Sequence, residues 1–463
     1  MFRICILCVR NGREVPHDTR EDRPPSPNPP PNLFHAPQTS IPLTKVFVVG
    51  IGNALEFYDF LTYSYFAIQI GHCFFPAAQT THGLLFSLAT FGAGFFTRPL
   101  GAIVIGRIGD RAGRKPAMVL SLALMGMGIT GLALTPSYAT IGIFAPILLL
   151  VFRLLQGFAL GGQVGPSTAF LIEAAPLYRR GLYVAVQFMT QDLAVVAAGV
   201  VGYALSNGLS ATALDLWGWR FAFLIGAAVV PFGVYLRTTL PETLTDANRD
   251  AIEHEPRRLP PRLLGLALLL MMAATIGGYG LSYMTTFAQD SLRLAAGVAF
   301  GATIMNGLGN LLGDLLSGLC SDRYGRKPVM LVSIVLLILL VLPGYLAMTH
   351  FPGALTVYLA TSVLCVLQQL FTNAAMVTIA ESLPTAVRST VLATLYAIAT
   401  TVFGGTTQLV IKLLTEGTGS SLAPAWYISG ALAIGAVAVI LIRETAPVKT
   451  GSSTFPHSTY PFR

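Results

Sequence analysis

Two acidic side chains lie inside a strongly apolar stretch, GNALEFYDFLTYSYF (residues 52–66). Glu56 and Asp59 are three residues apart, and Asn53 lies three residues before Glu56. On a helix, steps of three residues drift slowly around one side, so all three side chains can face the same neighbour. A carboxyl group in such surroundings can alternate between a charged and a neutral form. The stretch therefore indicates a site that binds and releases protons.

Three further ionisable residues lie deep in apolar stretches: Asp192 in QFMTQDLAVV, Arg98 in FFTRPLG and Arg153 in RLLQGFALGG. A charge at the centre of a bilayer costs about 2.5–3.5 kcal/mol on insertion scales, so each should face a partner or a water-filled cavity. A guanidinium presents a fork of donors that matches a carboxylate. We expect Glu56, Asp59, Asp192 and Arg153 to serve proton coupling. Arg98 fits either a substrate carboxylate or a structural pair with Asp59. Arg153 fits either a substrate carboxylate or a structural pair with Glu56 or Asp59.

Uncharged polar side chains in the apolar stretches complete the candidate substrate site. The predicted substrate-binding residues are Asn53, Arg98, Arg153, Gln156, Gln368 and Asn373. The amides among them fit a second role equally well, as hydrogen-bonding links between helices. Asp314, on the same helical face as Asn306 and Asn310, lies near the end of its apolar stretch and is expected to join the gate described below.

The composition excludes a water-soluble domain. Of the 463 residues 54% are hydrophobic and only 11% are charged, and the mean hydropathy is +0.67. A surface with so few charges belongs in a lipid bilayer. A membrane-crossing helix needs about 20 apolar residues. Twelve candidate spans cover residues 45–70, 83–105, 116–135, 141–165, 182–206, 218–237, 263–286, 297–317, 329–348, 353–378, 389–414 and 423–442.

Basic residues gather in the loops on one side of these spans, which sets the orientation and accounts for most of the net charge of +8. We therefore expect both termini to be cytoplasmic, a location in the inner (plasma) membrane, and no nucleic-acid partner. Between a Pro-rich N-terminal tail (1–42) and a C-terminal tail (443–463), both expected to lack structure, we expect two six-helix halves (43–239 and 263–442) joined by a cytoplasmic loop (240–262).

An internal repeat relates the two halves. GRIGDRAGRKP (residues 106–116) recurs as GLCSDRYGRKP (318–328), and each copy follows the second span of its half. The aspartate of each copy can accept hydrogen bonds from a neighbouring helix N-terminus, where the helix dipole favours an anion. The arginines can pair with glutamates on adjacent helix ends. Two parallel six-helix halves form a transporter architecture with its substrate site between them.

The motifs resemble those of the major facilitator superfamily. GNALEFYDF, FFTRPLGAIVIGRIGDRAGRKPA, RLLQGFALGG and WGWRFAFLIG are similar to its metabolite:proton symporter branch, over residues 43–445. The resemblance implies a cytoplasmic gate, and it ties Arg153 to proton or substrate coupling. It also exposes two departures: Gln163 stands where glutamate is usual, and Asp192 where a small or amide residue is usual. The implied gate residues are Gly106, Asp110, Arg111, Gly113, Arg114, Glu173, Asp322, Arg323, Gly325, Arg326 and Glu381.

We expect an all-α integral membrane transporter that takes up a small organic acid, such as citrate or another tricarboxylate or dicarboxylate, together with protons by alternating access. Glycines 157, 161 and 165, four residues apart on the fourth span, should let a neighbouring backbone approach closely. Uptake of a zwitterion such as proline or betaine is the alternative, and a transporter-like nutrient sensor a remote one. The sequence predicts a monomer, with no enzymatic activity, cofactor or metal.

Overall fold

The computed structural model describes residues 54, 57–58, 61–75, 80–111, 114–161, 168–169, 171–172, 175–239 and 259–450. Within these ranges all regular structure is helical. The first group of helices comprises α2 (Ala67–Phe74), α3 (Thr80–Phe96), α4 (Arg98–Arg111), α5 (Arg114–Leu134), α6 (Tyr138–Ile141), α7 (Phe144–Leu160), η1 (Leu177–Arg179), α9 (Arg180–Gly208), α10 (Ala211–Ala213), the π-helical turn η2 (Leu214–Gly218) and α11 (Trp219–Thr239).

The second group follows after residues 259–260. It comprises α13 (Pro261–Ser282), α14 (Met284–Asp290), α15 (Ala296–Tyr324), α16 (Arg326–His350), α17 (Ala354–Ser382), α18 (Thr385–Ala399), the π-helical turn η3 (Thr400–Gly404), α19 (Gly405–Thr418), α20 (Ala423–Leu441) and α21 (Pro447–Thr450).

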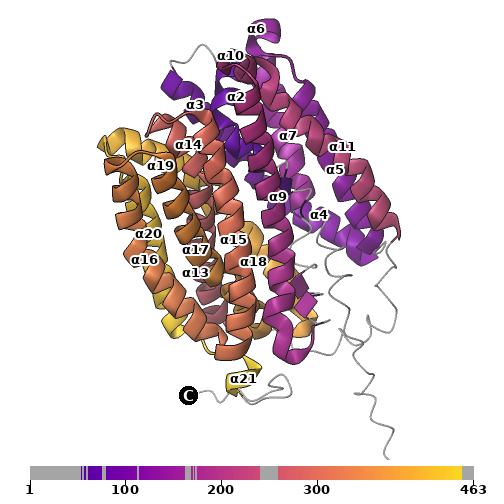
Figure 1. The fold of residues 1–463 in the computed structure, drawn as a ribbon. Helices are drawn as coiled ribbons and strands as arrows, with labels where there is room; N and C mark the ends of the chain where they lie inside the picture. Colours follow the sequence, from indigo (N-terminus) through magenta and orange to yellow (C-terminus); the bar gives the residue numbers. More distant parts are fainter. Residues whose placement is uncertain are drawn as a thin grey trace, which may run out of the picture. The chain divides into compact units, whose positions relative to one another are not determined.

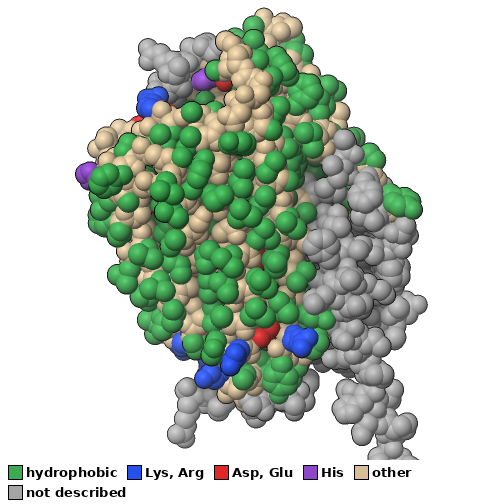
Figure 2. Space-filling view, viewed as in Figure 1, with side chains coloured by type: hydrophobic (Ala, Val, Ile, Leu, Met, Phe, Trp, Pro, Cys, Tyr) green, Lys and Arg blue, Asp and Glu red, His purple; other side chains and the backbone are tan. Residues whose placement is uncertain are grey.

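Seven helical segments in the described residues are long and apolar enough to cross a membrane. They are Gly83–Ile105, Leu177–Gly208, Pro261–Ser282, Arg326–His350, Ala354–Ser382, Thr390–Thr418 and Ala423–Leu441. Two shorter apolar helices, Val119–Leu134 and Phe144–Leu160, fall on further predicted spans. Large apolar side chains such as Val332, Leu339, Leu359, Val437 and Ile440 stand exposed on the outer surface. Figure 2 shows this apolar belt, with Lys and Arg gathered at one end of it.

The two groups of helices meet along α9 and α15, which run side by side in Figure 1. Small residues allow the close approach: a Cβ at Gly202 would overlap the ring of Phe300, and one at Gly307 would meet the backbone of Asp192 and Val196. One end of this helix pair holds the start of α9, the end of α15 and the start of α16, and we call it the Arg326 end. The opposite end we call the His72 end.

A second contact between the groups joins α3 to η3 and α19, and it depends on a proline. Pro99 has no N–H and so cannot hydrogen-bond to the carbonyl of Phe95, and the helix breaks at Thr97 between α3 and α4. The hydroxyl of Thr401 in η3 donates to that released carbonyl at 2.9 Å. Nearby, Gly92 and Gly405 bring the two backbones together. The predicted span 83–105 is therefore two helices that meet at a kink.

The expected close packing of the fourth span is confirmed at two of its glycines. A Cβ at Gly157 would overlap the carbonyl oxygen of Gly94, and one at Gly161 would overlap that of Arg98. Gly165 lies outside the described residues. The backbone of α7 therefore rests directly on α3 and α4, and this contact fixes the position of Arg153 on α7.

The C-terminal segment differs from the expectation of a structureless tail after Arg443. The Glu444 carboxylate accepts hydrogen bonds from the backbone N–H groups of Arg326 and Lys327, both at 3.0 Å, and so caps the start of α16. The Lys327 ammonium donates to the carbonyl of Ile442 at 3.0 Å. Free N–H groups at a helix start favour an anionic partner, and Glu444 supplies one to α16. These contacts hold the segment after Arg443 against the start of α16.

We expect Gly157→Ala to lower the melting temperature of the purified protein by several degrees. The added methyl group would press on a backbone carbonyl, which cannot move aside as a flexible side chain would, and overpacking of this kind costs about 1–3 kcal/mol. The matched control is Gly430→Ala in α20, where no atom lies within 4 Å of the added Cβ. Equal melting temperatures for the two variants would contradict this packing.

Candidate functional site

A cavity of about 150 Å³ lies between the two groups of helices. Its wall contains Phe57, Leu61 and Tyr65 of the first span and side chains from α9, α13, α15, α17, α18 and η3. Aromatic rings form much of the wall: Phe57, Tyr65, Phe188, Tyr279 and Tyr396. The polar side chains of the wall include Gln191, Asp192, Thr275, Ser282, Asn306, Asn310, Gln369, Thr372 and Thr400. Because both groups contribute, the cavity changes shape whenever they move relative to each other.

Asp192 is the acidic residue of the cavity wall among the described residues, and it is 4% exposed. The amide of Asn310 donates to its Oδ1 at 3.1 Å and also to the side-chain oxygen of Asn306 at 3.1 Å. Asn306 in turn donates to the carbonyl of Leu281 at 3.2 Å. A chain of amides thus runs from Asp192 on α9 through α15 to α13. The other two acids predicted to carry protons, Glu56 and Asp59, lie outside the described residues.

Asp314 is placed differently from the sequence expectation, which assigned it to the gate. It is fully buried about 15 Å from the end of α15, judged from the rise per residue, and it is too deep to reach the gate. Its oxygens accept hydrogen bonds from Asn373 at 3.3 Å and from Gln369 at 3.5 Å. The residue therefore belongs with the polar groups next to the cavity.

The Arg153 guanidinium is fully buried on α7. Its Nη1 donates to Oε1 of Gln156 at 2.7 Å, and its Cζ lies 4.3 Å from the ring centroid of Tyr63 and 5.3 Å from that of Phe91. Aromatic faces stabilise a cation at such distances. Neither Arg153 nor Gln156 is among the residues that line the cavity. Arg153 lies behind the wall, because Phe91, over which its guanidinium stands, packs against the wall residue Tyr279. Glu56 and Asp59, the partners expected for Arg153, are outside the described residues.

Arg98 opens α4 directly after the kink and is 3% exposed. Its Cζ lies 4.1 Å from the ring centroid of Phe95, and the guanidinium lies beside Tyr396, a residue of the cavity wall. This places Arg98 just behind the wall, in contact with the second group of helices. Its expected partner Asp59 and the predicted ligand Asn53 are outside the described residues.

The two remaining predicted ligands lie beside the cavity on α17. The Gln368 amide donates to the carbonyl of Ala274 at 3.0 Å and to the hydroxyl of Thr372 at 3.1 Å, so it links α17 to α13. Asn373 binds Asp314. The polar side chains that α17 contributes to the cavity wall are instead Gln369 and Thr372. Apolar periodicity does not show which of several neighbouring polar residues faces the cavity when the helix is buried on most sides. Gln191 and Thr372 were not among the predicted ligands for the same reason.

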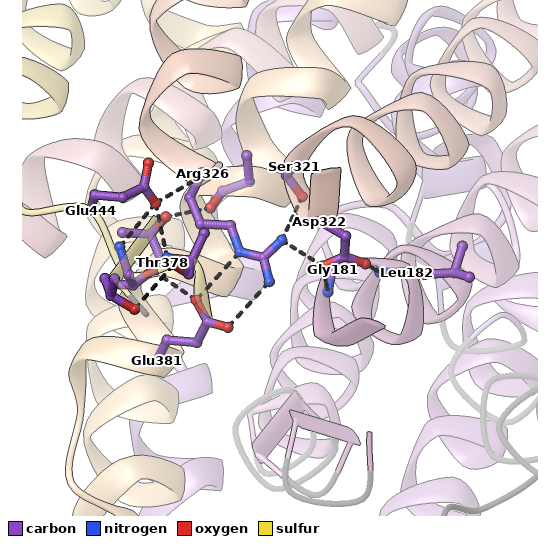
Figure 3. Close-up of polar contacts among 12 residues, drawn as sticks. Gly181, Leu182, Ser321, Asp322, Arg326, Thr378, Glu381 and Glu444 are labelled. Carbon is purple, nitrogen blue, oxygen red and sulfur yellow. Dashed lines mark hydrogen bonds and ion pairs between the residues drawn. The ribbon is translucent and has the colours of Figure 1, made fainter. Parts of the chain in front are cut away.

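At the Arg326 end, Asp322 of α15 meets the start of α9. Its two carboxylate oxygens accept hydrogen bonds from the backbone N–H groups of Gly181 at 2.9 Å and of Leu182 at 3.0 Å (Figure 3). The contact expected for this aspartate at a neighbouring helix N-terminus is therefore present. It joins the two groups of helices across the end of the cavity.

Arg326 supports this contact from α16. Its side chain is fully buried, with Nη1 2.6 Å from Oδ1 of Asp322 and Nη2 3.2 Å from Oε1 of Glu381 (Figure 3). Gly325 precedes it at φ 104°, a conformation that side-chain-bearing residues rarely adopt, and a Cβ there would meet Glu444. Arg323, a predicted gate residue, is exposed and lies over the ring of Tyr324, 5.5 Å from its centroid, so it takes no part in this ion-pair network.

The structure describes the first copy of the repeat mainly through its backbone. The backbone of Gly106, Asp110 and Arg111 forms the end of α4, and Arg114 begins α5. Their side-chain surroundings are not described, and neither are Gly113 and Glu173. Their assignment to a gate stays a prediction.

The His72 end carries an exposed ion pair beyond the predicted first span. Nδ1 of His72 on α2 lies 3.0 Å from Oδ2 of Asp215 in η2. The hydrogen bond to Asp215 raises the pKa of His72 above its ordinary value of 6.5. Next to the pair, Arg220 donates to the carbonyl of Thr135 at 2.9 Å. At the same end the amide of Gln69 in α2 donates to Gln289 of α14, so the two groups also touch here.

The family model described as "Sugar (and other) transporter" matches residues 45–251. A citrate-proton symporter of Klebsiella pneumoniae is 33% identical over 408 residues, which are 86% of this chain and 91% of that protein. A proline/betaine transporter of Escherichia coli (strain K12) is 31% identical over 421 residues, or 87% of this chain and 83% of that protein.

The crystal structure of a D-xylose-proton symporter superimposes with a TM-score of 0.70 at 18% identity, over 89% of this chain and 99% of that one. At this identity the likeness shows the fold alone: twelve membrane-spanning helices arranged as two parallel six-helix halves. The first and second groups of helices described above are these halves, and the cavity lies between them.

We expect Arg326→Ala to destabilise the protein by about 3 kcal/mol or more, because it leaves two buried carboxylates without their cation. Thermal unfolding in detergent measures the effect, and Arg323→Ala, three residues earlier in the chain and on the exposed surface, is the control. The account of this end would be wrong if both variants unfolded at the wild-type temperature.

The His72–Asp215 pair should stabilise the protein in acid only. Because the folded pKa of His72 is raised, the contribution is fully present below pH 6.5 and is lost as the pH rises through the folded pKa. Asp215→Asn should therefore lower the melting temperature at about pH 5.5 and leave it unchanged at about pH 9. His350→Gln, at the exposed end of α16, removes a histidine outside the pair and is the control. A pH-independent effect of Asp215→Asn would contradict the pairing.

Proposed function

The chain belongs to the metabolite:proton symporter branch of the major facilitator superfamily, and from this premise we propose that it takes up a small organic acid together with protons by alternating access. It is a membrane transporter and not an enzyme. The observation that carries the proposal is the cavity between the halves, with a buried carboxyl group on its wall and contacts between the halves at both of its ends.

Alternating access requires that the contacts at the two ends open in turn. At the Arg326 end the contact rests on the Asp322 carboxylate and two backbone N–H groups. At the His72 end it involves an amide pair, Gln69 and Gln289, at 3.4 Å. Hydrogen bonds of this kind can be exchanged for bonds to water at modest cost, so the halves can rock about the cavity. The remaining gate residues of the first repeat would act in the same way.

Proton coupling needs a group that changes charge as the cavity changes sides. Asp192 on the wall is suited to this role, together with Glu56 and Asp59 of the first span. Arg153 would respond to the charge of these acids from the layer behind the wall.

Two arginines support an anionic substrate. Arg98 and Arg153 stand behind the aromatic side of the wall and lend it positive potential. The likeness to citrate-proton symporters favours a tricarboxylate or dicarboxylate. The polar wall residues, with Asn53, Gln156, Gln368 and Asn373 behind or beside them, would orient it.

A zwitterion is the second candidate, and a specific observation favours it. Five aromatic rings line the cavity, and a quaternary amine binds well against aromatic faces. The proline/betaine transporter among the relatives agrees with this reading. The two candidates differ in net charge, so competition experiments separate them.

We further propose that the protein is a monomer in the inner (plasma) membrane, with both termini and the Arg326 end on the cytoplasmic side. The basic loops at that end support the orientation. Residues 43–239 and 263–442 would be the two halves, 240–262 the loop that joins them, and 1–42 and 443–463 the tails.

Uptake into proteoliposomes tests the function. We expect radiolabelled citrate or a dicarboxylate to accumulate when the outside is more acidic than the inside, and a protonophore to stop the accumulation. Unlabelled citrate should compete, and betaine should not. Preferred uptake of betaine would support the second candidate instead, and uptake of citrate that ignores the pH gradient would overturn the symport.

A further inference from the structure

Two buried aspartates from opposite halves face each other beside the cavity. Asp192 is on α9 of the first half, and Asp314 is on α15 of the second, one helical turn beyond Asn310, whose amide donates to Oδ1 of Asp192; the two carboxyl groups thus lie next to each other. Asp192 is 4% exposed and Asp314 is fully buried. Asp192 belongs to the cavity wall, whereas Asp314 stands behind it.

Amide groups supply all other hydrogen bonds that these carboxyls receive from the described residues. Asn310 donates to Oδ1 of Asp192, while Gln369 and Asn373 donate to Oδ2 and Oδ1 of Asp314. Oδ2 of Asp192 is buried and receives no hydrogen bond from any described donor. An ionised carboxylate is an acceptor only, so two of them in contact leave acceptor facing acceptor. A single proton between them turns this conflict into a hydrogen bond.

The charges around the pair do not offset a double negative charge. Neither aspartate forms an ion pair with a lysine or arginine of the described residues. Among the described residues, the titratable groups that interact with Asp192 from other elements are the Tyr65 hydroxyl of the first span and the Cys365 thiol of α17, besides Asp314 itself. Both are neutral near physiological pH. Like charges in contact inside a protein cannot both persist without a cation.

We propose that Asp192 and Asp314 together form a binding site for one transported proton, held between the two carboxyl groups as a link between the halves. The proposal rests on the proton-coupled function above and names its coupling site. The proton would enter from water in the cavity onto Asp192, and the O–H so formed donates to Asp314. When the cavity faces the cytoplasm, the proton leaves along the same path, and the two carboxylates repel each other.

The close packing of α9 against α15 makes the contact between the halves sensitive to the protonation of Asp192 and Asp314. Next to Asp192 the two helix backbones touch at Gly307, so a small separation of α9 and α15 breaks the carboxyl contact. The same helix pair carries the Asp322 contact at the Arg326 end. Gain or loss of one proton at its middle therefore changes how firmly the halves are held together.

Infrared difference spectroscopy of the purified full-length protein, titrated with acid, tests the site. We expect wild type to show a protonated carboxyl C=O band at neutral pH that shifts in D₂O. The band should vanish in Asp192→Asn/Asp314→Asn, persist in the control Glu416→Gln on α19, and move in Asp192→Glu. Absence of the band from wild type, or its persistence in the double variant, would overturn the proposal.

Transport separates this inference from the function it rests on. In proteoliposomes, citrate uptake by Asp192→Asn/Asp314→Asn should no longer respond to a pH gradient, because neither amide side chain can take up the proton. Accumulation driven by a pH gradient should fall to the wild-type level without a gradient. Undiminished accumulation by the double variant would overturn the proton site alone. Gradient-independent uptake by wild type would overturn the symport itself, while the infrared band would still report the proton.

Discussion

The packing of α9 against α15 is the constraint on which the rest of the molecule depends. Small residues bring the two backbones together over much of their length, and these helices come from different halves. The end of this contact is fixed by Asp322, and its middle carries Asp192 and Asp314. Together with the contact between α3 and α19, it holds the halves side by side and leaves the cavity between them. Any movement that opens the cavity must change this helix pair.

Among the described residues, buried cations are compensated in three different ways. Arg326 is neutralised by carboxylates at the end of α15 and on α17. Arg153 and Arg98 lie against aromatic rings, and Arg388 donates to the backbone carbonyls of Ala380 and Leu383. Only 11% of the residues are charged, so each such position reflects a definite requirement. The carboxyl pair fits the same rule, because a proton takes the place of the missing cation.

Periodicity and the internal repeat predicted the fold, the positions of the described spans and the contact of Asp322 with a helix start. These depend on local pattern, which a sequence displays directly. Pro99 indicates the kink at Thr97, although an apolar run on both sides of it resembles one continuous helix. The partnership of Asp192 with Asp314 could not be read, because it depends on the register between helices from opposite halves. For the same reason the sequence does not distinguish Gln368 and Asn373, which lie beside the cavity, from Gln369 and Thr372 on its wall. Glu444 was assigned to a tail because its partners are the start of a helix far away in the sequence.

In our proposal, a proton shared across α9 and α15 controls how closely the halves approach each other at the Arg326 end. Pulsed electron spin resonance measures this directly, with nitroxide labels on Tyr178 beside α9 and Leu319 on α15, two exposed positions, after replacement of the native cysteines. The account predicts a short distance in acid and a longer population in alkali for wild type. It predicts a short distance at every pH for Asp192→Asn/Asp314→Asn. A wild-type distance that ignores pH, or a double variant that responds as wild type does, would contradict it.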